Sequence, residues 1–390
     1  MRWIFVAAVL LTGCAGTFEG RSDKPTYAAT LDTIVPRLIA ENSIAGVGIA
    51  VIKQGRVTWE GYYGEQAPGV PVTRETAFNT ASVAKTITAE TMLSLAARGQ
   101  IDLDEPIAPY VQHPDLSKDD RYFGLTPGLL LSHRGGLLNW AYAYDDAILA
   151  FDHDPGTRTS YSGAGMELVA QYAAAKTGRP LSELADEAVF APLGIKNAAL
   201  GVIPPWAEGH MSQPMDGEGR FRTIGELNPG LEGSSANSAA DDFVVTVPAY
   251  AKLVASLTTG GSKLAGHAAE RETLLASLAD DAIYACEPLD WLTCPDAYGH
   301  SIGWQVYQWG DHTLLKHTGS DAGEVAFVYA SPDMGHGAVI FVNGANGWPV
   351  VVRIIEAIGQ EPLVADYYQG LFATRLGIEL APLEVWMSEE

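Results

Sequence analysis

The sequence predicts an α/β chain of the α+β kind, in which an antiparallel sheet is flanked by terminal helices and a mainly helical domain is inserted. Two observations carry this prediction. Apolar and polar residues alternate near both ends of the 390-residue chain, in 46–63 and again between 298 and 343, as in half-buried strands. Residues 101–199, between them, show helical spacing and proline turns instead. We therefore expect strands from both ends to share one sheet.

Three elements are predicted in the first hundred residues. A helix over 28–41 follows from apolar residues at helical spacing, namely Leu31, Ile34, Val35, Leu38 and Ile39. A hairpin over 46–63 follows because two alternating runs flank the turn Lys53-Gln54-Gly55. The stretch 82–97 is rich in Ala and Leu and stops near Gly99, which predicts a second helix.

The rest of the chain alternates between helical and strand patterns. Helices are predicted over 164–175, which stops at Gly178, and over 181–190. Strands and a closing helix follow, at 302–309, 312–317, 325–330, 338–343 and 349–358. The predicted organisation is a sheet domain formed by 28–100 and 200–376, a mainly helical domain over 101–199, and a C-terminal tail over 377–390.

Composition excludes several classes of function. The chain has 24 Lys and Arg against 47 Asp and Glu, a net charge of −23, so its surface repels a phosphate backbone and we expect no nucleic-acid partner. The nine His and three Cys show neither HExxH nor zinc-type spacing. We therefore expect no metal and no other cofactor.

The N-terminus is predicted to be a targeting segment. An apolar run over 4–11 follows Arg2, is too short to span a bilayer, and ends in Leu11-Thr12-Gly13-Cys14. That ending resembles the lipobox of bacterial lipoproteins. The resemblance implies a signal peptide at 1–13, a lipid on Cys14, a tether over 14–27, and anchoring in the bacterial cell envelope. The residue after the cysteine is Ala15, not the Asp that often signals retention in the inner membrane in that family, which favours the outer membrane. The alternative is a plain signal peptide with an incidental cysteine.

Two cysteines remain if Cys14 carries lipid. Cys286 and Cys294 lie close together in the sequence, and an extracytoplasmic compartment permits them to pair. We therefore predict a disulfide that closes a short loop, worth roughly 2–3 kcal/mol.

The segment Ser82-Val83-Ala84-Lys85 carries the candidate chemistry. Positions i and i+3 share a helix face, so a hydroxyl and an amine can meet there. A helix N-terminus also favours developing negative charge. Lys85 can act as the base if burial or nearby cations lower its pKa by about three units.

Two further motifs support the prediction of a catalytic site. Tyr161-Ser162-Gly163 precedes a helix, and a phenol near a lysine ammonium loses its proton more easily and can relay it. His317-Thr318-Gly319-Ser320 lies at the end of a strand, where small residues let a substrate approach the backbone. The alternative for Tyr161 is a purely structural role, as a core tyrosine whose hydroxyl is hydrogen-bonded.

Together, in this order, these motifs resemble those of the penicillin-recognising serine hydrolases, which include class C β-lactamases, D-alanyl-D-alanine carboxypeptidases, D-aminopeptidases and related esterases. Other stretches are similar to landmarks of that family: Phe78–Lys85, Leu129–Leu137, Pro192–Ile195 and Ile302–Trp304. The similarity runs from about residue 28 to 360 and implies the β-lactamase-like fold.

The resemblance implies a role for each motif. Ser82 is the acylated nucleophile, and Lys85 and Tyr161 are the proton-transfer pair. The motif that begins with His317 binds substrate, with His where many members have Lys, and the backbone N–H groups of Ser82 and Ser320 form the oxyanion hole. The implied substrate is an ester, a β-lactam or a D-amino-acid peptide. Gly163 departs from the family's Tyr-x-Asn, which favours an esterase or D-amino-acid peptidase over an efficient β-lactamase.

Three rival interpretations stay open. Lys176-Thr177-Gly178 resembles the third motif but is typical of a helix end. Gly299-His300-Ser301-Ile302-Gly303 has the GxSxG form of a nucleophile elbow, with Asp311 and His336 as possible partners, yet a strand rather than a helix follows it. The third is a non-catalytic envelope protein that uses the same fold to bind a ligand.

Overall fold

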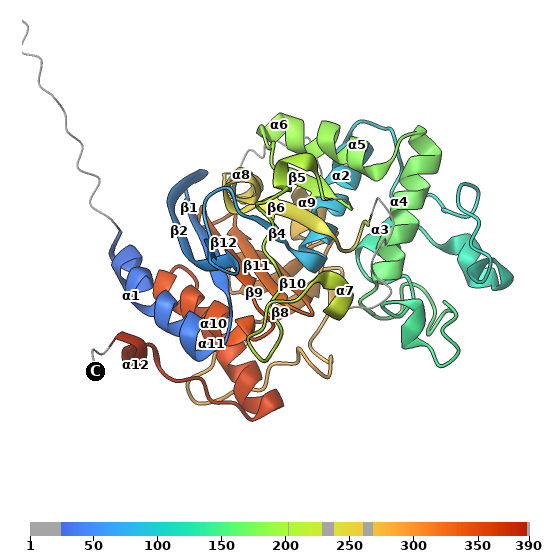
Figure 1. Ribbon diagram of the computed structural model, residues 1–390. Helices are drawn as coiled ribbons and strands as arrows, with labels where there is room; N and C mark the ends of the chain where they lie inside the picture. Colours follow the sequence, from blue (N-terminus) through green and yellow to red (C-terminus); the bar gives the residue numbers. More distant parts are fainter. Residues whose placement is uncertain (1–24, 202, 228–237, 260–267, 388–390) are drawn as a thin grey trace, which may run out of the picture.

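Figure 1 shows the protein as a computed structural model, which describes residues 25–201, 203–227, 238–259 and 268–387. The predicted signal peptide at 1–13, the lipidation residue Cys14 and the predicted tether as far as residue 24 lie outside the described residues. Within the described ranges, no helix is long and apolar enough to cross a membrane. The helix α1 begins at Thr26, two residues inside the predicted tether, directly after Pro25.

One antiparallel sheet of nine strands organises the chain, in the order β3-β2-β1-β12-β11-β10-β9-β8-β7. Strand β1 pairs with β12 in continuous register from Gly46–Asn343 to Lys53–His336. The two ends of the chain therefore meet in one sheet, as the sequence predicts. The strands are β1 Gly46–Lys53, β2 Arg56–Ala67, β3 Val70–Pro71, β7 Ala276–Ser277, β8 Ala297–His300, β9 Gln305–Trp309, β10 His312–Asp321, β11 Glu324–Ser331 and β12 His336–Asn343.

The predicted hairpin turn is present between β1 and β2. Gln54 and Gly55 both have positive φ, 54° and 70°, as the two central residues of a tight hairpin turn require. The predicted strand over 302–309 begins only at Gln305, because Gly303 has a φ of 70° that interrupts an extended backbone.

Helices cover both faces of the sheet (Figure 1). Alternate residues of β1 point to opposite faces, so Val47, Ile49 and Val51 pack in one apolar cluster and Ala50 and Ile52 in another. The first cluster includes α1, α10 and α11; the second includes α2 and α8. These helices are α1 Thr26–Glu41, α2 Ala84–Ala97, α8 Val247–Leu257, α10 Gly347–Ile358 and α11 Pro362–Leu371. Neither α8 nor α11 was predicted.

The helical part of the chain packs around α2. Its helices are α3 Pro127–Leu131, α4 Gly163–Thr177, α5 Leu181–Ala185 and α6 Ala191–Leu193. A second sheet of three strands, β4 Ala77–Asn79, β6 Phe243–Thr246 and β5 Ala198–Leu200, runs in the order β4-β6-β5. The remaining short helices are α7 Ile224–Leu227, α9 Ala268–Glu272 and α12 Leu383–Met387.

The string Lys176-Thr177-Gly178 ends α4 and has a structural role. Gly178 caps the helix with a φ of 74°, in the left-handed region that glycine adopts readily. Lys176 forms an ion pair with Glu105. The resemblance of this string to the third motif is therefore incidental.

A cluster of ionisable side chains joins the strand ends β10 and β12 to the start of α11. His312 lies between two carboxylates, 2.9 Å from Asp333 Oδ2 and 2.9 Å from Glu361 Oε2. His336 contacts the other oxygen of Glu361, at 2.6 Å. The hydrogen bond with Glu361 is the main cause that raises the pKa of His312 to about 9.

This raised pKa predicts a pH-dependent stability. Because the folded-state pKa of His312 lies above its ordinary value of 6.5, its stabilising contribution is complete below pH 6.5 and is lost as the pH rises through about 9. We expect the difference in free energy of unfolding between the wild type and His312→Gln to be largest near pH 6 and to shrink toward pH 10. Urea unfolding at several pH values measures it. The exposed His210→Gln is the control, and a difference that grows with pH would contradict the assignment.

Candidate active site

Ser82 lies in a tight turn just before α2. Residues Ala81–Val83 form one 3-10 turn and the α-helix begins at Ala84, so the predicted helix start at 82 is two residues early. Ala81 has a φ of 46°, a strained value for a residue with a side chain. Thr80 holds the turn in place, since its backbone N and its Oγ1 both donate to Phe243 O, at 2.9 and 3.1 Å.

Ser82 and Lys85 are in hydrogen-bond contact, as their i, i+3 spacing predicts. Lys85 Nζ lies 2.9 Å from Ser82 Oγ and donates to Ala240 O at 2.7 Å. The lysine side chain is 1% exposed, because α2 is enclosed on all sides. The amine is therefore held against the hydroxyl with little access to water.

Burial also sets the charge of Lys85. Loss of hydration lowers its pKa to about 8, while the carboxylates of Asp241 and Glu167 oppose that shift. Glu167, on α4, accepts a hydrogen bond from Ala239 N at 2.7 Å and so holds the segment that presents Ala240 O to the lysine. A neutral amine beside Ser82 is thus accessible near neutral pH.

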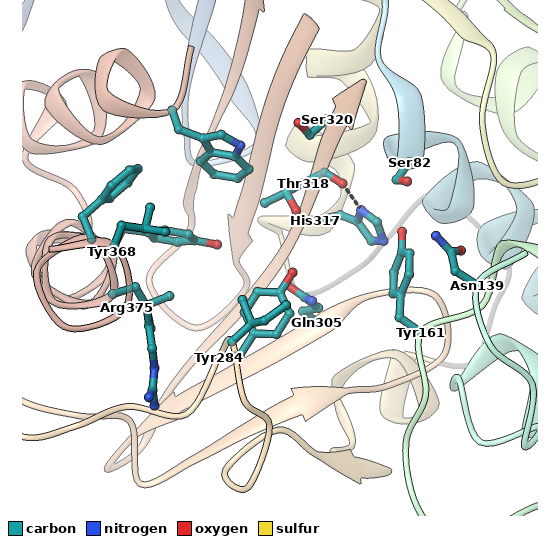
Figure 2. A pocket seen from close by; sticks show the side chains of 15 residues that line it. Ser82, Asn139, Tyr161, Tyr284, Gln305, His317, Thr318, Ser320, Tyr368 and Arg375 are labelled. Atoms are coloured by element: carbon teal, nitrogen blue, oxygen red, sulfur yellow. Dashed lines mark hydrogen bonds between the residues drawn. The ribbon is translucent and has the colours of Figure 1, made fainter. Parts of the chain in front are cut away.

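Tyr161 joins this pair from the loop before α4. Its hydroxyl points toward Ser82 (Figure 2), and Lys85 Nζ lies 4.7 Å from the centroid of its ring. The ring packs at a tilt of 36° against His133, with centroids 4.4 Å apart, and His133 Nδ1 accepts from Ser162 N at 3.1 Å. His133 therefore positions the tyrosine loop.

The phenol is not made acidic, contrary to the sequence-based expectation. Burial raises the pKa of Tyr161 and outweighs the nearby Ser82 hydroxyl, which lowers it. Tyr161 is thus protonated in the resting protein, and Lys85 is the group with the lowered pKa.

The motif that begins with His317 forms the end of β10 opposite Ser82. His317 Nδ1 donates to Thr318 O at 2.8 Å, which leaves Nε2 as an acceptor, and within the described chain this buried nitrogen has no hydrogen-bond partner. Burial and the nearby Lys85 hold the pKa of His317 well below its usual range. The imidazole is therefore neutral.

Gly319 lets β10 approach the Ser82 turn. A Cβ on Gly319 would lie 2.0 Å from Thr80 O and 3.2 Å from Ser82 N, so only glycine fits without moving the backbone. Ser82 and Ser320 consequently border the same cavity. Their backbone N–H groups are the donors that the resemblance assigns to the oxyanion hole.

Trp140 occupies the place of the side chain that Gly163 lacks. A Cβ on Gly163 would lie 2.3 Å from Cζ2 of the Trp140 indole. The neighbouring Asn139 accepts a hydrogen bond from Gly163 N at 2.8 Å through Oδ1, and its amide also lines the cavity (Figure 2). An amide thus reaches the site from a different loop than in the Tyr-x-Asn pattern.

The cavity beside Ser82 has a volume of about 450 Å³. Ser82, Tyr161, Asn139 and His317 lie at one end of it, and Tyr368 and Arg375 at the other (Figure 2). Its far walls are mostly apolar and aromatic, formed by Tyr284, Trp348, Tyr368, Leu371, Phe372 and Leu376. Within the described parts of the chain, no group of three or more His, Cys, Asp or Glu side chains is arranged to hold a metal ion.

The loop between β7 and β8 forms one wall of the cavity. A disulfide joins Cys286 and Cys294, whose Cα atoms are 5.8 Å apart. The loop is also tied to α11 and β8: Tyr367 donates to Tyr284 O at 2.7 Å, and Cys286 N donates to Tyr298 Oη at 2.8 Å. The cross-link therefore belongs to the part of the chain that presents Tyr284 to the cavity.

The GxSxG string does not form a nucleophile elbow. Ser301 is fully buried, its Oγ donates to Trp304 O, and the chain continues into β9, not into a helix. The nominated partner His336 contacts Glu361. Ser301 is therefore a core residue.

Sequence reasoning missed several residues of this site. Asn139 and Trp140 directly follow the Leu129–Leu137 landmark, but their contact with Gly163 spans 24 and 23 residues and leaves no local pattern. Gln305 lines the cavity from the first position of β9. A polar residue at the first position of a strand was the one available signal for it.

Comparison with known proteins places this chain in a family. The family model described as Beta-lactamase matches residues 31–359, so the chain belongs to the β-lactamase family, whose relatives are serine hydrolases. A β-lactamase of Pseudomonas fluorescens is 26% identical over 358 residues, which cover 83% of this chain and 95% of that protein. Esterase EstB of Burkholderia gladioli is 28% identical over 213 residues, 47% of this chain and 54% of EstB.

A solved structure gives the same fold. The D-alanine carboxypeptidase AmpC from Burkholderia cenocepacia superposes with a TM-score of 0.65 at 18% identity, over 85% of this chain and 99% of that one. The predicted β-lactamase-like fold and the family resemblance are confirmed.

The contact between Trp140 and Gly163 predicts energetic coupling. Gly163→Asn should displace the indole and cost about 1–3 kcal/mol of stability. We expect Gly163→Asn/Trp140→Ala to lose at least 1 kcal/mol less than the sum of the two single variants, roughly the coupling of residues in direct contact. Urea unfolding of the double-mutant cycle measures this. Trp206→Ala, in a separate cluster, should be additive with Gly163→Asn; additivity at Trp140 would refute the overlap.

Proposed function

We propose that this protein is a serine esterase that forms an acyl-enzyme on Ser82. The observation that carries the proposal is the 2.9 Å contact between Ser82 Oγ and the fully buried amine of Lys85, whose pKa is lowered. A hydroxyl becomes a nucleophile when a neighbouring base accepts its proton, and this is the pair that meets that requirement.

The proposed reaction has two halves. Neutral Lys85 takes the Ser82 proton as Oγ attacks the ester carbonyl carbon, and the backbone N–H groups of Ser82 and Ser320 stabilise the oxyanion. Collapse of the tetrahedral intermediate expels the alcohol, whose oxygen receives a proton from the Lys85 ammonium through the Tyr161 hydroxyl. Water then attacks the carbonyl carbon of the acyl-enzyme and loses a proton to neutral Lys85 through the Tyr161 hydroxyl. Collapse of this second intermediate returns the proton from Lys85 to Ser82 Oγ and releases the carboxylic acid.

Three features favour an ester over a β-lactam or a peptide with a free carboxylate. His317 is neutral, so the part of β10 that lines the cavity offers no positive charge to a substrate carboxylate. The cation at the far end, Arg375, is already paired with Glu287 at 2.8 Å. The walls between these ends are largely aromatic and aliphatic, which suits an uncharged acyl or alkoxy group.

The nucleophile is tested by labelling with a fluorophosphonate. We expect the wild type and Ser301→Ala to be labelled and Ser82→Ala to be unlabelled. We also expect turnover of 4-nitrophenyl acetate to exceed turnover of a cephalosporin and of a D-alanine amide. A cephalosporin or D-alanine amide turned over faster than any ester would replace the esterase by a β-lactamase or a peptidase. Absence of labelling and of all turnover would favour a binding protein.

The lowered pKa of Lys85 predicts the pH dependence of acylation. Because the neutral amine is the base, the acylation rate should rise with pH through a midpoint near 8. Lys85→Arg stays protonated and should reduce the rate by about 10²–10⁴-fold. Single-turnover kinetics from pH 6 to 10 measure both, and an unchanged rate in Lys85→Arg would rule out this role.

A second variant tests the electrostatic cause. The Asp241 carboxylate raises the pKa of Lys85, so Asp241→Asn should move the midpoint to lower pH. Asp311→Asn, on an exposed turn, is the matched control and should leave the midpoint in place. A midpoint that moves to higher pH in Asp241→Asn would contradict the assignment.

A further inference from the structure

The amide of Gln305 is a polar group in a largely apolar stretch of the cavity wall. Gln305 opens β9, is 4% exposed, and lines the cavity, where it lies between Tyr284 and His317 (Figure 2). Its register partner on β10 is Lys316, whose Nζ donates to Gln305 Oε1. Within the described chain, no acceptor is bonded to Gln305 Nε2. A buried amide therefore has its oxygen satisfied and its N–H groups free.

Lys316 determines which end of this amide faces the cavity. Its side chain is 1% exposed and lies among aromatic rings, 4.7 Å from the centroid of Tyr307 and 5.2 Å from that of Tyr368. An ammonium has donors only, so the amide oxygen must turn toward it and the NH₂ group must turn away. Burial lowers the pKa of Lys316 to about 7. A neutral amine also has a lone pair that can accept, so the orientation of the amide is fixed in the protonated form, below about pH 7.

A free donor in an apolar wall recognises a matching acceptor. Pockets of this kind achieve specificity through a few fixed polar groups, and a donor left unpaired by the wrong ligand carries a desolvation cost. A carboxylate has several acceptor sites, and one amide among aromatic walls would leave most of them unpaired. A carbonyl or ether oxygen needs a single donor.

We propose that Gln305 is a specificity-determining residue of this site and Lys316 its positioning residue: the Gln305 amide donates to a neutral oxygen, a carbonyl or an ether, on the apolar portion of the substrate. This inference rests on the proposed esterase function. It narrows the substrate class to uncharged esters whose apolar group, aromatic or aliphatic, carries an oxygen acceptor.

The test uses esters that differ only in the acceptor. Phenylalkyl esters with one to three methylenes carry a para-acetyl, para-isopropyl or para-carboxyl group, placed in turn on the acyl and on the alcohol side. We expect the wild type to prefer acetyl over isopropyl in kcat/KM by about three- to ten-fold on one side, the range of one neutral hydrogen bond. The ratio of two kcat/KM values does not depend on the fraction of enzyme that is folded.

Variants assign that preference to the amide. Gln305→Met keeps the length without the donor and should bring the ratio to about one; Gln305→Glu, which presents a carboxylate to Lys316, should do the same. Lys316→Met lets the amide turn over and should give an intermediate ratio. Gln308→Met, on the same strand, is the matched control and should retain the wild-type ratio and the wild-type hydrolysis of 4-nitrophenyl acetate.

The outcomes separate the two proposals. An acetyl preference that survives in Gln305→Met, or no preference on either side, overturns the role of Gln305 and leaves the pair with Lys316 as a core contact. A Gln305-dependent preference for the carboxyl ester overturns the neutral acceptor. If 4-nitrophenyl acetate is hydrolysed equally by the wild type and Ser82→Ala, the proposed function itself fails.

Discussion

The enclosure of Lys85 is the constraint on which the rest of the site depends. A lysine loses its charge near neutral pH only where water cannot reach it, and α2 provides that place because the sheet and α8 cover one side and the helical part of the chain the other. Every other group of the site is arranged around this amine. Ala240 O and Ser82 Oγ accept its hydrogen bonds, and Glu167 fixes the segment that carries Ala240.

The charge of the site contrasts with the charge of the chain. The protein as a whole carries −23, yet the imidazoles nearest the cavity are held neutral by burial, His317 and His133 well below their usual pKa and His300 at about 3. Arg375 is paired with Glu287, and Lys316 is buried behind Gln305. The cations and imidazoles around the cavity are therefore paired or held neutral, which suits the uncharged substrate proposed above.

Much of the fold was predictable because it follows from local patterns. The alternation in 46–63 and the turn at Gln54-Gly55 correspond to β1 and β2, and helical spacing at each end of the chain corresponds to α1 and α10. Among the elements that were missed, the strands β4, β5, β6, β7 and β8 are only two to four residues long, which is too short for a clear alternation. The helices α8 and α11 do carry apolar residues at helical spacing and could have been predicted. Ser82 and Lys85 were predictable because their contact spans one helical turn.

The sequence by itself determined the elements, the family and the three motifs, because each is written in residues that are neighbours along the chain. Only the tertiary structure decided how they act together. It showed that Trp140 fills the space above Gly163, that burial keeps Tyr161 protonated, and that Lys316 orients Gln305. Packing, exclusion of water and the direction of an amide depend on residues that only folding brings into contact, so no local pattern could contain them.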